Sequence, residues 1–151
     1  MVRKIALSIL AIIATVVLSS CSQSHSSIRE KIEAAFSQNK PELASELCNT
    51  LYSDLQNCSV ETLGDLTMRY YTLSVINSTR SNEVATYDAM DHMVNCYESA
   101  MKKNPTAAKA IWLKIADEGL NHGQSIDIPL IADSFRAQLH LRDILGEDIT
   151  D

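Results

Sequence analysis

The segment PELASELCNTLYSDL, residues 41–55, carries the periodicity that decides the fold of this chain. Its apolar side chains recur at intervals of three or four residues and occupy about half of a helix circumference, with polar side chains opposite. Pro41 stands at a first-turn position, where a helix needs no N–H donor. The segment therefore predicts an amphipathic helix over residues 41–56. The apolar face consists of Leu43, Ala44, Leu47, Cys48, Leu51, Tyr52 and Leu55.

Helix start and stop signals divide the rest of the chain into five further helices. Ser27 and Glu30 have the spacing of a capping box, and Pro105 and Pro129 stand where a first helical turn is expected. Ser59 and either Ser81 or Asn82 are the other expected N-caps. The five predicted helices cover residues 28–37, 60–78, 81–103, 105–121 and 129–146.

These helices predict an all-α domain. Connections of two to six residues favour antiparallel helical hairpins, so we expect about six helices in a bundle or a short repeat-like stack. Residues 60–78 are expected to form the most buried helix, and Gly119 to permit close approach between elements. A composition of 46% hydrophobic and 21% charged residues excludes a wholly disordered chain, and 4 Gly, 3 Pro and 5% aromatic residues disfavour a β-sandwich.

The amino terminus predicts export. Arg3 and Lys4 precede an apolar segment, residues 5–18, which is too short to cross a hydrocarbon core of about 30 Å. The following Leu-Ser-Ser-Cys, residues 18–21, resembles the lipobox of bacterial lipoproteins. This resemblance implies that residues 1–20 are a signal peptide and that the sulfur of Cys21 receives a diacylglyceryl group. The alternative is an ordinary secretory signal that leaves Cys21 as a thiol.

The resemblance to bacterial lipoproteins also sets the expected location. Ser22 stands where an Asp would favour retention in the inner membrane, and no acidic run follows Cys21. We therefore expect an anchor in the outer membrane that faces the periplasm. The polar residues 21–27 are expected to form a flexible tether, and residues 28–151 the helical domain.

Residues 93–105 resemble the second half of a tetratricopeptide repeat. Tyr97, Ala100 and Pro105 reproduce its aromatic, small and proline positions, whereas Met93 stands where a small residue is expected. The resemblance implies repeat-like packing of helical hairpins and assigns no ligand-binding residues.

Charge and motifs limit the functional classes. Without Arg3 and Lys4 the chain keeps 11 basic against 19 acidic side chains, a net charge of about −8, which disfavours nucleic acid as a partner. Asp88, His92 and Cys96 follow one another at helical spacing but lack a fourth zinc ligand. We therefore expect no metal, no cofactor and no enzymatic activity.

The favoured function is a lipid-anchored helical envelope protein that acts as a protein–protein interaction module. The alternatives are a small hydrolase or metal-dependent enzyme on a helical bundle, and a purely structural envelope lipoprotein. A partner is expected to bind a groove between hairpins through exposed aromatic side chains, although such residues more often fill a core. The candidates are Tyr70, Tyr71, Tyr87, Tyr97 and Trp112.

The remaining cysteines permit one disulfide in an oxidising compartment. Folding the helices back along one another places Cys48 and Cys96 at nearly the same height, whereas about 15 Å of helix separates Cys48 from Cys58. The predicted disulfide therefore joins Cys48 to Cys96. The alternative is that these thiols stay unpaired in the core.

Overall fold

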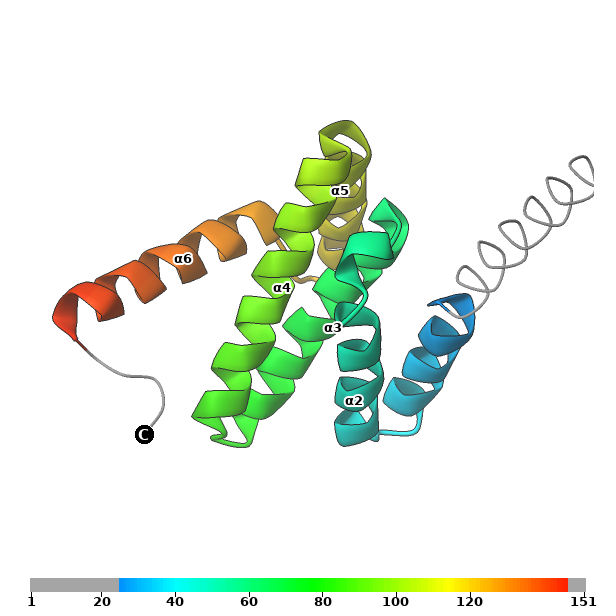
Figure 1. The fold of residues 1–151 in the computed structure, drawn as a ribbon, viewed down its shortest axis with the longest axis horizontal. Helices are drawn as coiled ribbons and strands as arrows, with labels where there is room; N and C mark the ends of the chain where they lie inside the picture. Colours follow the sequence, from blue (N-terminus) through cyan, green and yellow to red (C-terminus); the bar gives the residue numbers. More distant parts are fainter. Residues whose placement is uncertain (1–24, 147–151) are drawn as a thin grey trace, which may run out of the picture. The chain divides into compact units, whose positions relative to one another are not determined.

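The computed structural model describes residues 25–146, and every regular element in this range is a helix (Figure 1). This confirms the predicted all-α fold class for the described part of the chain. The predicted signal peptide, Cys21 and the tether up to residue 24 lie outside the described residues.

The chain divides into two compact units, residues 1–47 and 48–151. In the described part of the first unit, residues 25–37 are helical, and α2, Pro41–Tyr52, begins after a tight turn. Residues 25–27, assigned to the tether from the sequence, thus belong to a helix. A serine inside a helix costs only about 0.5 kcal/mol relative to alanine, so a polar turn can extend an amphipathic helix.

The turn before α2 depends on an asparagine. Lys40 N donates to Ala35 O at 2.9 Å, and Asn39 has a φ of 54°, in the left-handed region that asparagine tolerates better than most residues. Ile32, Ala35 and Ala44 are buried in this unit.

The second unit holds the end of α2 and all later elements. These are the 3₁₀ turn η1, Leu55–Asn57, and the helices α3, Val60–Thr79, α4, Glu83–Lys103, α5, Pro105–Asn121, and α6, Ile128–Leu145. The helix predicted over residues 41–56 ends earlier, at Tyr52. Polar residues after Tyr52 make local hydrogen bonds: Ser53 Oγ donates to Thr50 O, and Asn57 Nδ2 donates to Asp54 Oδ1. Such local bonds compete with continuation of a helix.

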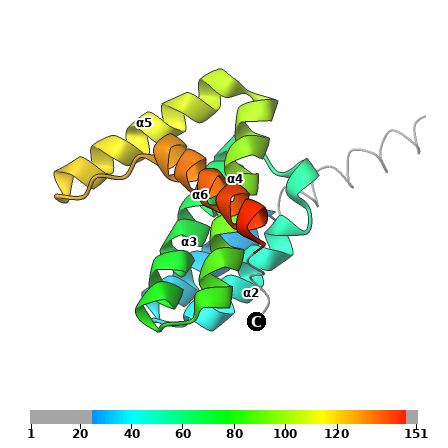
Figure 2. The same cartoon turned by 90° about the vertical axis from the view of Figure 1, so that its left-hand side faces the viewer.

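The core of this unit lies between α3 and α4, which run antiparallel and side by side (Figures 1 and 2). The buried apolar residues of α3 include Leu63, Leu66, Tyr70 and Leu73, which recur at heptad-like spacing. The buried residues of α4 are Ala89, Met93, Val94, Cys96 and Ala100. The two helices therefore form the central hairpin on which α5 and α6 pack.

Glycine allows α5 to approach α3 closely. A Cβ atom at Gly64 would lie 2.9 Å from Ile111 Cγ2, closer than side chains normally pack. At Gly119 the close neighbour is instead the loop that follows α5, because a Cβ there would lie 3.0 Å from Gln124 O. The approach predicted at Gly119 thus involves a loop rather than another helix.

Candidate interaction site

A groove with a volume of about 530 Å³ lies between α3 and α5. We call it the α3–α5 groove. Its apolar side chains are half-buried: Met68 from α3, Ile111 and Ile115 from α5, and Ile126 from the following loop. Because this chain covers these side chains only in part, they can contact apolar side chains of a ligand.

Charged side chains border the α3–α5 groove. They are Glu61, Asp65 and Arg69 from α3, and Lys114 and Glu118 from α5. Arg69 Nε lies 3.5 Å from Asp65 Oδ1, and Lys114 Nζ lies 3.7 Å from Glu118 Oε1. Lys114 and Glu118 are exposed, and an ion pair at such positions contributes little to stability, whereas Asp65 and Arg69 are half-buried. The border holds three carboxylates against two cations and is acidic on balance.

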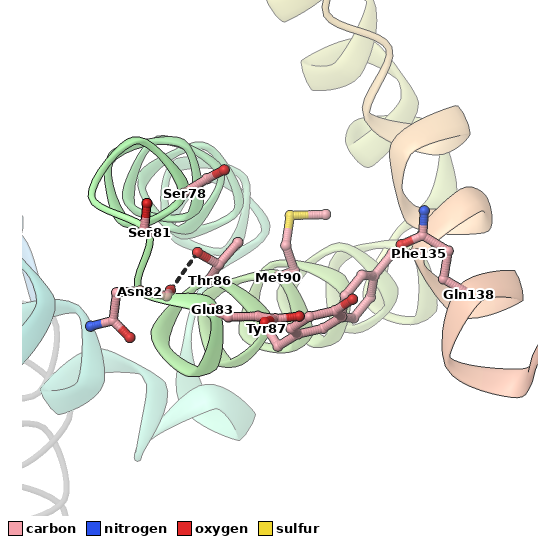
Figure 3. A pocket seen from close by; sticks show the side chains of 9 residues that line it. All are labelled: Ser78, Ser81, Asn82, Glu83, Thr86, Tyr87, Met90, Phe135 and Gln138. Atoms are coloured by element: carbon pink, nitrogen blue, oxygen red, sulfur yellow. Dashed lines mark hydrogen bonds between the residues drawn. The ribbon is translucent and has the colours of Figure 1, made fainter. Parts of the chain in front are cut away.

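A second cleft lies between the α3–α4 turn and α6 and encloses about 420 Å³ (Figure 3). Thr86 Oγ1 donates to Asn82 O at 2.7 Å on its polar side. On its aromatic side the rings of Tyr87 and Phe135 lie 5.9 Å apart, and the Arg142 guanidinium lies 4.5 Å from the Tyr87 ring centroid. Tyr87 is thus engaged in holding α6 against α4.

A third cavity of about 400 Å³ lies between α5 and the start of α6. Trp112 lines it but is only 4% exposed, and its ring packs on that of Tyr97 at 5.4 Å. Within residues 25–146, its indole N–H has no hydrogen-bond partner. That nitrogen is buried, so a ligand in the cavity would reach it only after a rearrangement.

The five predicted aromatic residues therefore do not form one surface. Tyr70 and Trp112 are buried, whereas Tyr71, Tyr87 and Tyr97 are half-buried. All five lie within residues 25–146, and none of them lines the α3–α5 groove. Ile111 and Ile115, which do, lie on the same apolar face of α5 as the buried Ala108 and Trp112. Helical spacing groups such residues but does not tell whether a neighbour covers them.

Tyr70 belongs to an aromatic cluster in the core. Its hydroxyl donates to Asn49 Oδ1 at 2.8 Å, and its ring packs edge-on against Tyr52. The ring of His92 lies 4.0 Å from that of Tyr52 and 5.0 Å from that of Tyr70. Burial lowers the pKa of His92, so the imidazole is held neutral as a packing group.

The pattern of Asp88, His92 and Cys96 does not converge in space. Cys96 is fully buried, whereas Asp88 is exposed. Among the described residues, no three His, Cys, Asp or Glu side chains lie close enough together to hold a metal ion.

Cys48, Cys58 and Cys96 are free, buried thiols in the structure. Burial raises the pKa of all three, and that of Cys48 reaches about 12. Cys58 Sγ donates to Leu51 O at 3.6 Å. The Cys48–Cys96 disulfide stays a prediction for the oxidised protein.

Comparisons with known proteins identify no family. No protein-family model matches the chain, and neither the curated proteins nor the solved structures contain a match to it. None of the helices between residues 25 and 146 combines the length and apolar character that a membrane crossing requires. The resemblances to a lipoprotein signal and to a tetratricopeptide hairpin stay predictions, and the α3–α5 groove is the candidate site for a partner.

Proposed function

We propose that this chain is a lipid-anchored interaction module of the bacterial envelope, which binds an amphipathic segment of another protein in the α3–α5 groove. The observation that carries the proposal is the groove itself, with half-buried apolar side chains between two rows of charges. An amphipathic helix or extended segment places apolar anchors into such a groove and its polar side chains along the border.

The border charges favour a basic partner segment. Glu61, Asp65 and Glu118 outnumber Arg69 and Lys114, so lysine or arginine beside the apolar anchors would find opposite charge on both helices. The apolar contacts with Ile111, Ile115 and Met68 would supply most of the affinity.

Photo-crosslinking tests the groove. We expect a photoreactive residue in place of Ile115, in the full chain in native envelopes, to crosslink one discrete protein. The matched control is Val84, an apolar residue of α4 that is 48% exposed and lies outside the groove. Ile115→Glu should weaken binding of that protein about tenfold or more, while Val84→Glu should leave binding unchanged.

Stability must be measured beside binding, because Ile115 is half-buried. An Ile115→Glu variant with wild-type Tm and lost binding supports a docking site. Crosslinks that are identical at positions 115 and 84, or unchanged binding by both variants, would refute the groove as the partner site.

We further propose that Cys21 is acylated and holds the module at the periplasmic face of the outer membrane. Two or three acyl chains give stable anchoring, so Cys21→Ser is expected to move nearly all of the protein from the membrane to the soluble fraction. Ser22→Ala, next to the modified position, is the control and should stay in the membrane. Mass spectrometry of the wild-type amino-terminal peptide gives the second readout, and a soluble chain with an unmodified Cys21 would overturn the anchor.

A further inference from the structure

Helix α6 carries a second apolar stripe on the side opposite its buried face. The buried face consists of Ile128, Ala132 and Phe135. On the other side, Leu130, Leu141 and Ile144 are 62%, 57% and 66% exposed. With Ser134 and Ala137 they follow the alternating four- and three-residue spacing of a coiled-coil seam. We call Leu130, Ser134, Ala137, Leu141 and Ile144 the α6 stripe.

The packing of α6 within the monomer keeps this stripe outward. α6 packs on α4 and α5, and two of its arginines form ion pairs with α4: Arg136 pairs with Glu98, and Arg142 Nη2 lies 3.5 Å from Glu83 Oε1. In the view of Figure 2, α6 crosses in front of α4 with no other described helix in front of it. The stripe spans about 21 Å of helix that nothing in the described part of the chain covers.

We propose that the α6 stripe is a self-association surface, on which two copies of this chain pair their α6 helices antiparallel about a twofold axis near Ala137. The middle of the stripe is small, with Ser134 and Ala137, so two helices can approach closely there. The side chains at its two ends, Leu130 and Ile144, are large. Antiparallel pairing places Leu130 of one copy against Ile144 of the other, so each apolar end meets an apolar end.

The polar residues beside the stripe select the antiparallel orientation. Asp133 and His140 lie on one edge of the stripe, four residues before and three residues after Ala137. In an antiparallel pair, Asp133 of each copy meets His140 of the other, and the imidazole N–H can donate to the carboxylate. In a parallel pair, the same two residues would meet Gln138 and Leu145, which carry no charge. The arrangement is thus complementary to itself, which a different partner would not require.

A cysteine at the axis tests the pairing in the full chain. Ala137→Cys is expected to give a disulfide-linked dimer under mild oxidation, because the two new thiols would face each other across the axis. Asp143→Cys, on the same helix but off the stripe, is the matched control and should remain monomeric. The native thiols within residues 25–146 are buried and identical in both variants.

Sedimentation of chains without an introduced cysteine gives the second measurement, the dissociation constant of the dimer. Leu141→Glu replaces an exposed side chain, so the fold should persist while the dissociation constant of the dimer rises about tenfold or more. Asp133→His should also weaken the dimer, and Asp133→His combined with His140→Asp should restore it.

The proposal is independent of the α3–α5 groove, since α6 variants should leave crosslinks from position 115 unchanged. A wild-type chain that stays monomeric at all concentrations would overturn it, as would equal crosslinking of Ala137→Cys and Asp143→Cys. Crosslinks from the α6 stripe to a different protein alone would also overturn it.

Discussion

Replacing Tyr70 with alanine is expected to lower the free energy of unfolding by about 3–5 kcal/mol, the range for deleting a large buried aromatic side chain. Tyr70 is 1% exposed and contacts the rings of Tyr52 and His92. Its removal leaves a cavity between the two helices that form the core, and it leaves Asn49 without the hydroxyl donor. Urea unfolding followed by circular dichroism measures the loss.

Two further variants distinguish the contribution of the Tyr70 ring from that of its hydroxyl, and the contribution of a core residue from that of a half-buried one. Tyr70→Phe keeps the ring and removes only the 2.8 Å hydrogen bond to Asn49, so it should cost about 1 kcal/mol. Tyr71→Ala, at the half-buried neighbouring residue, should cost much less than Tyr70→Ala. If Tyr70→Ala kept wild-type stability and lost partner binding, Tyr70 would be a binding residue and its assignment to the core would be wrong.

Helix boundaries were predictable where a single residue type has one strong local preference. Pro41 and Pro105 are the first residues of α2 and α5, and Pro129 is the second residue of α6. Ser59 accepts a hydrogen bond from Thr62 N, as an N-cap should. At the start of α4 the sequence left Ser81 and Asn82 as alternatives, and Asn82 is the cap, because its side chain accepts from Ala85 N. Such preferences act within one turn and need no tertiary structure.

The groove and the α6 stripe were not predictable in the same way. Ile111 and Ile115 share one apolar face of α5 with buried residues, and only the position of α3 leaves them half-covered. Leu141 and Ile144 could equally have met another part of the same chain. Periodicity gives the apolar faces of a helix, whereas tertiary packing decides which of them is covered.

The aromatic residues illustrate the same limit. Tyr70 and Tyr71 are adjacent in the sequence and chemically identical, yet one is buried in the core and the other is half-buried. Their side chains point about 100° apart around α3, and Tyr70 lies on the face toward α4. From the sequence alone, five aromatic residues remained candidates for a binding surface, and none of them lines the α3–α5 groove.

Raising the pH from 9 to 12 under reducing conditions is expected to destabilise the protein through Cys48. Burial raises the pKa of this thiol from 9.0 to about 12, so the unfolded chain loses its proton at a lower pH than the folded chain does. The stabilisation is fully present below pH 9 and is lost as the pH rises through 12. The complete loss is about 4 kcal/mol, and urea unfolding at a series of pH values measures it.

Cys48→Ala isolates this contribution from other groups that titrate in the same range, among them Cys96 and Tyr70, whose pKa values burial also raises. The variant should be less stable than the wild type at pH 8, because it leaves a small cavity, but its stability should fall less steeply above pH 9. An equal slope in both proteins would show that Cys48 ionises as easily when folded as when unfolded. Repeating the titration of the wild type without reductant extends the test to the predicted disulfide, since a Cys48–Cys96 bond removes both thiol protons and with them this part of the pH dependence.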